Sequence, residues 1–121
     1  MMFSAFIFSF LFILNSTAKA DTMPKTEAPY LAADLHCDAP MKIVKGKTLT
    51  GRTSQVTIAK LQKGRIGLQV FACWVPPTYR RQKAIDYTLD MIARTKSEIA
   101  KFPNDLMIVT DKVSWQKCLK E

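Results

Sequence analysis

The stretch DLHCDAP, residues 34–40, holds the only histidine of the chain and two carboxylates at alternate positions. Alternate residues of a β-strand point to the same side, so Asp34, His36 and Asp38 share one face if strand geometry continues through Asp38. Imidazole nitrogen and carboxylate oxygen are both good zinc ligands, and a spacing of two lets both reach one ion. The pattern therefore predicts part of a metal site, with His36 and Asp38 as ligands.

The same residues have a simpler interpretation that the pattern leaves open. A single histidine at a strand end is also typical of a hydrogen-bonded residue in a core or at its rim. A closed zinc site needs about four ligands and a catalytic one about three plus water, whereas the chain has no second histidine. Cys37 points to the other side of the strand and is a poor candidate for this site. The chain alone therefore cannot complete a histidine-rich site.

The elements that must position these side chains begin with three predicted strands. Apolar, β-branched and aromatic residues predict strands at residues 30–36, 66–75 and 106–109. The middle strand is nearly all apolar, which is typical of a strand covered on both faces in a parallel sheet. Residues 42–55 hold two glycines and several Thr and Ser, and they predict a long connection that is ordered only if something packs on it.

Three helices are predicted between and after these strands. Thr57 can cap a short helix over residues 57–63, and Gly64 suits a left-handed residue at its end. The longest helix is predicted over residues 81–101, where apolar residues fall on one face at helical spacing: Ile85, Leu89, Ile92 and Ile99. A last helix follows a cap at Thr110 or Asp111. The alternation of strands and helices predicts an α/β fold with parallel strands.

The first twenty residues differ from the rest in composition. Phe3 to Leu14 is an unbroken apolar run, too short for a bilayer that needs roughly 20 residues. It precedes Ala18-Lys-Ala20, an A-x-A cleavage pattern. We predict a signal peptide over residues 1–20, a mobile leader over 21–29, and export to the periplasm or the outside, although the segment before the run lacks Lys and Arg. An uncleaved anchor or a buried core helix are the alternatives.

Charge and cysteine content narrow the classes of partner. The chain carries 18 basic and 10 acidic residues, a formal net charge of +8, which could favour nucleic acid or an anionic surface. The basic residues are spread along the chain and no aromatic residues interleave with them, so we predict a solvated basic face and no nucleic-acid partner. The three cysteines form no C-x-x-C pattern, and we expect them to be mostly buried small hydrophobic residues.

The pattern D-x-H-x-D-x-P at residues 34–40 resembles the first barrel strand of the membrane (renal) dipeptidases, the M19 family of zinc peptidases. The resemblance continues in order over nearly all of residues 30–111. Residues 58–64 and 66–71 resemble the family's short helix and second strand, although Val70 stands between Gln69 and Phe71. Residues 84–92 resemble the next helix, and residues 102–110 resemble the next strand.

The resemblance implies a (β/α)8 TIM-like metallohydrolase barrel, of which residues 30–121 are an incomplete N-terminal part. It implies two zinc ions that activate water for attack on the peptide bond of a dipeptide. His36 and Asp38 would hold the first ion, and Asp34, without binding the ion itself, would orient the histidine ring. The family's bridging glutamate, later histidines and substrate-binding arginine have no counterpart here, and Glu121 is not assigned to any of these roles.

The resemblance therefore implies a zinc metallodipeptidase at the level of the family and a chain that is inactive by itself. An unclosed parallel sheet exposes strand edges, so self-association through those edges is also expected. Two other interpretations stay open: a small secreted basic binding protein, and a non-catalytic remnant of a dipeptidase gene.

Overall fold

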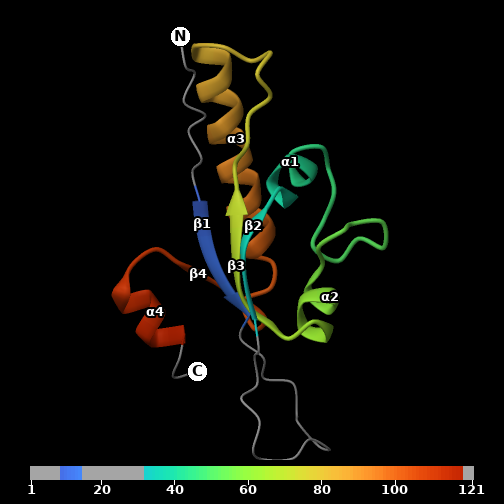
Figure 1. Ribbon diagram of the computed structural model, residues 1–121, viewed down its shortest axis with the longest axis vertical. Coiled ribbons are helices and arrows are strands. Elements are labelled where there is room, and N and C mark those ends of the chain that lie inside the picture. The colour runs from blue at the N-terminus through green and yellow to red at the C-terminus, as the bar shows by residue number, and fades with distance from the viewer. Residues whose placement is uncertain (1–8, 15–31, 119–121) are drawn as a thin grey trace, which may run out of the picture.

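A single four-stranded sheet organises the chain, whose computed structural model describes residues 9–14 and 32–118. The strands are β1 (Ser9–Leu14), β2 (Ala32–Cys37), β3 (Ile66–Ala72) and β4 (Leu106–Val109), in the order β2-β3-β1-β4 (Figure 1). β2 and β3 are parallel, and β1 lies antiparallel between β3 and β4. The mixed α/β class with a short parallel portion agrees with the prediction, whereas a barrel is not seen in these residues.

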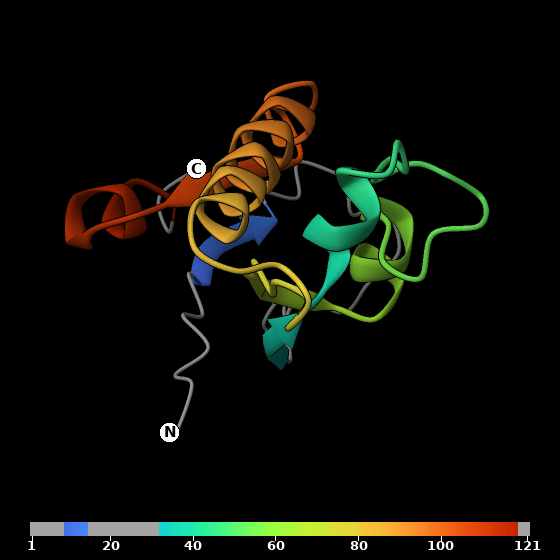
Figure 2. The same ribbon diagram turned by 90° about the horizontal axis from the view of Figure 1, so that it is seen from above.

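Four helices accompany the sheet in the described ranges: α1 (Ala39–Ile43), α2 (Ile58–Lys63), α3 (Gln82–Ile99) and α4 (Lys112–Cys118). Side chains of α1, α2 and α3 share one core with β3 and β4, and α4 packs separately beside β4. Figure 2 shows α4 on the opposite side of the molecule from α1 and α2. Within those ranges no helix has both the length and the apolar character needed to span a bilayer.

The core explains why the long connection between α1 and α2 is ordered. Phe71 of β3 and Leu49 of the connection are 0% and 1% exposed, and both belong to the main core cluster. Burial of a leucine side chain contributes about 1.5–3 kcal/mol, enough to fix the middle of an otherwise polar segment. The burial of Leu49 therefore holds the connection in place. This agrees with the prediction that the connection is ordered only if something packs on it.

Helix α1 is not among the predicted elements, because Pro40 follows the predicted strand at residues 30–36 closely and proline is typical of the end of a strand. Pro40 instead occupies the first turn of the helix, where the missing amide hydrogen costs nothing and the fixed φ favours helical geometry. The predicted strand at residues 30–36 is found as β2, and the structure describes it from Ala32 to Cys37.

The short helix α2 begins as predicted and ends differently. The Thr57 side chain accepts a hydrogen bond from the Lys60 amide at 3.2 Å, which confirms the cap. The prediction of a left-handed Gly64 was wrong: Gly64 has φ −79° and Arg65 has φ 54°. The Arg65 amide still donates to the Gln62 carbonyl at 3.0 Å, so the turn continues by one residue before the chain reverses.

The long helix α3 is confirmed, and its predicted apolar face is buried only in part: Ile99 is 4% exposed and belongs to the main core cluster. Ile85 and Leu89 are 53% and 59% exposed, whereas Met91 is fully buried. The N-terminal half of α3 extends beyond the strands in Figure 1, so only its C-terminal half contacts the sheet. Helical spacing alone could not show where the sheet ends.

The apolar N-terminal run contains strand β1, in a segment where no strand was predicted. Its register runs from Ser9 opposite Ala72 to Ile13 opposite Leu68 on the β3 side, and from Leu11 opposite Val109 to Leu14 opposite Leu106 on the β4 side. Residues 1–8 and 15–31, which hold the rest of the predicted signal peptide and leader, lie outside the described residues. The signal peptide and export stay predictions.

Candidate functional site

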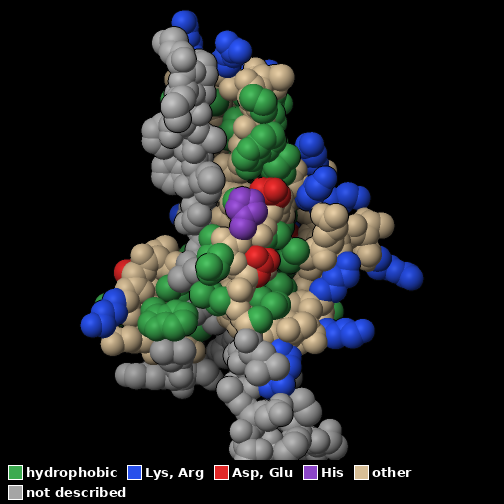
Figure 3. Space-filling view, viewed as in Figure 1, with side chains coloured by type: hydrophobic (Ala, Val, Ile, Leu, Met, Phe, Trp, Pro, Cys, Tyr) green, Lys and Arg blue, Asp and Glu red, His purple; other side chains and the backbone are tan. Residues whose placement is uncertain are grey.

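His36 and Asp38 come together at the carboxyl end of β2. The strand ends at Cys37, and Asp38 occupies the position before α1 with φ −87° and ψ 21°. The turn still brings His36 Nε2 to 3.4 Å from Asp38 Oδ1, with side chains 58% and 53% exposed. Figure 3 shows the histidine, in purple, on the visible face between acidic side chains. The pair is therefore accessible to an ion from solvent.

Asp34 contacts this pair through the main chain of His36. Its Oδ1 atom accepts a hydrogen bond from the backbone amide of His36 at 3.0 Å. The carboxylate thereby fixes the backbone from which the imidazole extends. A contact of Asp34 with the ring itself, as the family resemblance implies, is not among the hydrogen bonds of residues 32–118 and stays a prediction.

Cys37 belongs to the core side of β2. It is half-buried and packs against the main core cluster, and its Sγ accepts a hydrogen bond from the Ala39 amide at 3.4 Å. Burial raises the pKa of the Cys37 thiol, and the charges of Asp34 and Asp38 raise it further, against the opposing effect of the Ala39 bond. Cys37 faces the core rather than the pair, and in the described part of the chain it does not complete a group of three side chains that could hold a metal ion.

The separation of the two candidate ligand atoms is compatible with zinc. Ligand atoms bound at about 2.0–2.1 Å to a tetrahedral zinc ion lie about 3.3–3.4 Å apart, and His36 Nε2 and Asp38 Oδ1 are 3.4 Å apart. The described part of the chain contains no group of three or more His, Cys, Asp or Glu side chains that could hold a metal ion. The pair therefore fits as two ligands of a site, without forming a whole one.

A cavity of about 420 Å³ opens beside the pair, between the end of β2, α1 and the connection that follows α1. We call it the site cavity. Its lining includes His36 and Asp38, the apolar side chains of Leu49 and Val56, and a set of polar side chains from α1 and the connection: Lys42, Lys47, Thr48, Thr53, Ser54 and Gln55. These polar residues were not predicted as part of a site, because residues 42–55 carry only the pattern of a long connection.

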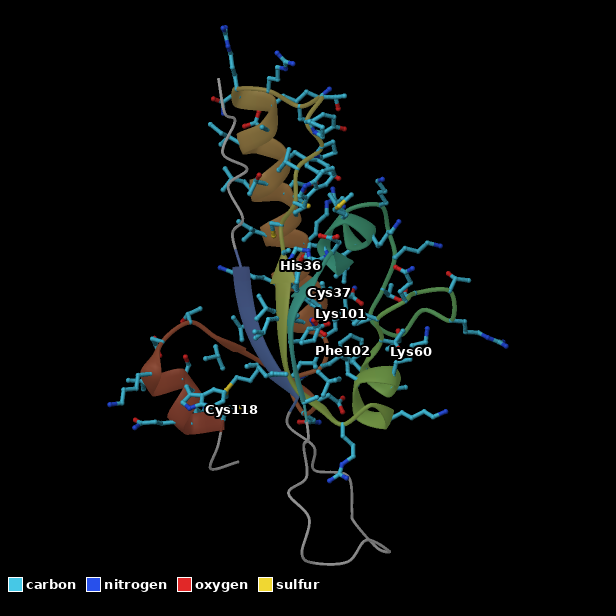
Figure 4. All side chains as sticks on the ribbon, viewed as in Figure 1. His36, Cys37, Lys60, Lys101, Phe102 and Cys118 are labelled. Carbon is cyan, nitrogen blue, oxygen red and sulfur yellow. The ribbon has the colours of Figure 1, made fainter. Side chains whose placement is uncertain are left out.

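The wall of the site cavity is held by hydrogen bonds to buried groups. The Leu49 amide donates to Glu98 Oε1 of α3 at 2.9 Å. Within the wall, Ser54 Oγ donates to the Thr48 carbonyl at 2.8 Å, and Lys60 Nζ of α2 donates to the Ser54 carbonyl at 2.6 Å. Figure 4 shows Lys60 on the α2 side of the molecule, and His36 and Cys37 near the centre of the molecule.

Comparison with known proteins gives one finding. The family model described as "Membrane dipeptidase (Peptidase family M19)" matches residues 25–120. Searches of the curated proteins and of the solved structures returned no match. The matched range includes β2, the site cavity and every described element after it, and it spans well over half of the 121 residues. The chain therefore belongs to the membrane dipeptidase family, peptidase family M19.

Proposed function

We propose that this chain is the front section of a zinc-dependent dipeptidase and that His36 and Asp38 bind the first zinc ion. The observation that carries the proposal is the 3.4 Å separation of their ligand atoms at the carboxyl end of a parallel strand. In α/β barrels this end of the strands is where catalytic residues gather. Membership of the M19 family supports peptide hydrolysis as the reaction.

Each residue of the pair has a distinct task in this proposal. The neutral imidazole of His36 donates the lone pair of Nε2, and the Asp38 carboxylate donates a negatively charged oxygen. Asp34 holds the backbone of His36 through its 3.0 Å hydrogen bond, which limits how far the ring can move. Zinc, when bound, supplies Lewis acidity for the scissile carbonyl and for the attacking water.

The remaining ligands must come from outside this chain. His36 is the only histidine among the 121 residues, while a catalytic zinc ion needs about three protein ligands and a TIM barrel needs eight strands. We therefore propose that the chain alone hydrolyses no dipeptide. We also propose that residues 1–20 direct export, on the evidence of their apolar run and A-x-A pattern.

The single histidine allows a direct test of the metal pair. In proton NMR of the full 121-residue chain, the imidazole signals belong to one residue, so a zinc titration reports on His36 alone. We expect these signals to shift on zinc addition, and we expect Asp38→Ala to weaken binding about 10-fold or more. Asp86→Ala removes an exposed carboxylate of α3 and serves as the matched control. Equal zinc affinity in both variants would contradict the assignment of Asp38.

The activity is tested in a longer protein that carries this chain at its start. His36→Ala should abolish dipeptide hydrolysis and lower the zinc content of that protein, because the first ion loses a ligand. Unchanged zinc content and activity in His36→Ala would show that the pair is not part of the metal site. A remnant without catalytic task would show no hydrolysis even with both residues intact.

A further inference from the structure

We propose that strand β1 is a removable spacer, which keeps β3 and β4 apart until its loss lets these two strands pair directly. The inference rests on the proposed function, because the proposed export signal in residues 1–20 contains all of β1, and the proposed barrel is built from neighbouring parallel strands. Its own evidence is the order, direction and register of the strands, which is separate from the metal pair.

The direction of β1 differs from that of the other described strands. β2 and β3 are parallel, and β1 is antiparallel to both β3 and β4, so β3 and β4 run parallel to each other on either side of β1 (Figure 1). Helix α3 connects β3 to β4. A helix that joins two parallel strands usually joins neighbours in the sheet, so β1 occupies the position where β3 and β4 would be adjacent.

The family match also sets β1 apart from the sheet that contains it. The matched residues, 25–120, include β2, β3 and β4 and exclude Ser9–Leu14. A segment from outside the match therefore lies between two strands from inside it. Because all eight strands of a TIM barrel are parallel, a barrel that uses β3 and β4 as neighbours has no place for an antiparallel strand between them.

The register of β1 leaves β3 and β4 aligned for direct pairing. Leu11 lies opposite Val70 of β3 and also opposite Val109 of β4. Once β1 is gone, a sideways movement by one strand spacing of about 4.7–4.9 Å brings Val70 beside Val109, with no shift along the strands. Direct pairing then supplies new partners for the backbone groups that β1 leaves unpaired.

Closure within one chain competes with pairing between chains. β3 and β4 both lose a partner when β1 leaves, and an open strand edge also pairs with the edge of another copy. Because α3 holds β3 and β4 in one chain, each strand has a high effective concentration for the other. Closure should therefore dominate in dilute protein and association between copies in concentrated protein.

The spacer makes the final strand order depend on the removal of residues 1–20. While β1 is in place, β3 and β4 are two strand spacings apart, and a barrel that needs them as neighbours cannot close. In a longer protein that carries this chain at its start, the barrel would therefore form only after export has removed the signal. The chain would be kept from activity until it has left the compartment of synthesis.

The test measures a disulfide across the position of β1 in the full 121-residue chain, with the three native cysteines replaced by alanine. Val70→Cys with Val109→Cys places the two Cα atoms about 9–10 Å apart while β1 separates them. A disulfide spans only roughly 4.4–6.8 Å between Cα atoms, so this pair reports closure. Oxidation is followed in dilute protein, and gel electrophoresis separates bonds within a chain from bonds between chains.

Substitutions in β1 then release the spacer. Phe12→Pro removes a backbone donor from the middle of the strand, whereas Phe12→Val retains it and is the matched control. We expect the bond between positions 70 and 109 to form about 10-fold faster in Phe12→Pro than in Phe12→Val, because only closure brings the thiols within reach. Ile13→Pro is a second release variant and should give the same increase.

An off-register pair distinguishes closure from unfolding. Ile66→Cys with Val109→Cys uses a position four residues earlier in β3, about 13 Å from position 70 along the strand. An unfolded chain would form both bonds at similar rates, whereas closure favours the bond between positions 70 and 109. Equal rates in Phe12→Pro and Phe12→Val, equal rates for the two cysteine pairs, or bonds only between chains would each overturn the spacer.

Failure of the spacer can be told apart from failure of the proposed function. The disulfide measurement needs neither zinc nor a substrate, so its outcome is independent of His36 and Asp38. Mass spectrometry of the exported longer protein shows whether residues 1–20 are removed. If they are retained, the export proposal fails while the disulfide result stands. If they are removed and positions 70 and 109 form no bond, the spacer alone is wrong.

Discussion

Glu98 of α3 accepts a hydrogen bond at 2.9 Å from the backbone amide of Leu49, 49 positions earlier in the chain. The carboxylate is 4% exposed and also pairs with Lys101 at 2.6 Å. This contact joins the wall of the site cavity to the helix behind it. Glu98, which is far from His36 in the sequence, therefore helps to position the residues that line the site cavity.

Replacement of Glu98 should therefore destabilise the chain. Glu98→Ala leaves the buried Leu49 amide without its acceptor, and we expect a loss of about 2 kcal/mol in the free energy of unfolding. The ion pair adds little to this figure because the Lys101 side chain is 60% exposed. Urea denaturation of Glu98→Ala and of the unmodified chain provides the measurement.

The matched control removes a carboxylate from the same helix. Asp90 pairs with Arg94 at 2.8 Å on an exposed surface, so Asp90→Ala should cost about 0.5 kcal/mol or less. A similar cost for Asp90→Ala and Glu98→Ala would show that the Leu49 contact contributes nothing beyond an ordinary surface charge.

The cap of α2 supplies a second prediction. Thr57 is 7% exposed and accepts a hydrogen bond from the Lys60 amide, so Thr57→Ala should cost about 1 kcal/mol. Thermal unfolding followed by circular dichroism measures this loss. Thr78→Ala, an exposed threonine in a turn, should leave the midpoint unchanged. An unchanged midpoint in Thr57→Ala would contradict a role of the cap in stability.

The thiol of Cys73 gives a pH-dependent prediction. Burial raises the pKa of Cys73 from 9.0 to about 11, so the folded state favours the protonated thiol. The resulting stabilisation is fully present below pH 9 and is lost as the pH rises towards 11. At pH 8 only about 0.1% of this thiol is ionised, and alkylation by iodoacetamide should be slow until urea unfolds the chain. Rapid alkylation of Cys73 in the folded chain would contradict its burial.

Strand β1 can be tested by removing one of its hydrogen-bond donors. Phe12 pairs with Gln69 on one side and Ile108 on the other, and proline in a central strand removes a ladder hydrogen bond. Phe12→Pro should cost about 2 kcal/mol or more in the free energy of unfolding. Phe12→Val keeps the donor and is the conservative comparison. Equal stability of Phe12→Pro and Phe12→Val would argue against a central β1.

Removal of residues 1–20 should promote self-association. Without β1, both β3 and β4 lose the neighbour that pairs with them, and unpaired strand edges bind other edges. Light scattering after gel filtration should show larger species for residues 21–121 than for the full chain. A monomer with a cooperative thermal transition would overturn this prediction.

Much of the fold could be predicted where local pattern and tertiary environment agree. β4 has the predicted bounds, and Thr57 caps α2, because both depend on residues within a few positions. On α3 the burial of Ile99 was predicted correctly, whereas the exposure of Ile85 and Leu89 could not be predicted, because it depends on where the sheet ends. At the candidate site, the spacing of His36 and Asp38 predicted that their side chains lie together, and they are 3.4 Å apart. The wall of the site cavity could not be predicted in this way, because it depends on the contact between Leu49 and the distant residue Glu98.

The position of β1 also has a consequence for the order of events during synthesis. Leu14 leaves the ribosome before either partner strand exists, and Val109 follows it by roughly 95 residues. At bacterial and eukaryotic elongation rates this interval lasts about 5–20 s. During the first part of that time, before β3 (Ile66–Ala72) has been made, this apolar segment has neither partner strand and is accessible to any factor that binds nascent chains. The proposed export signal in residues 1–20 would therefore be accessible before the sheet is complete.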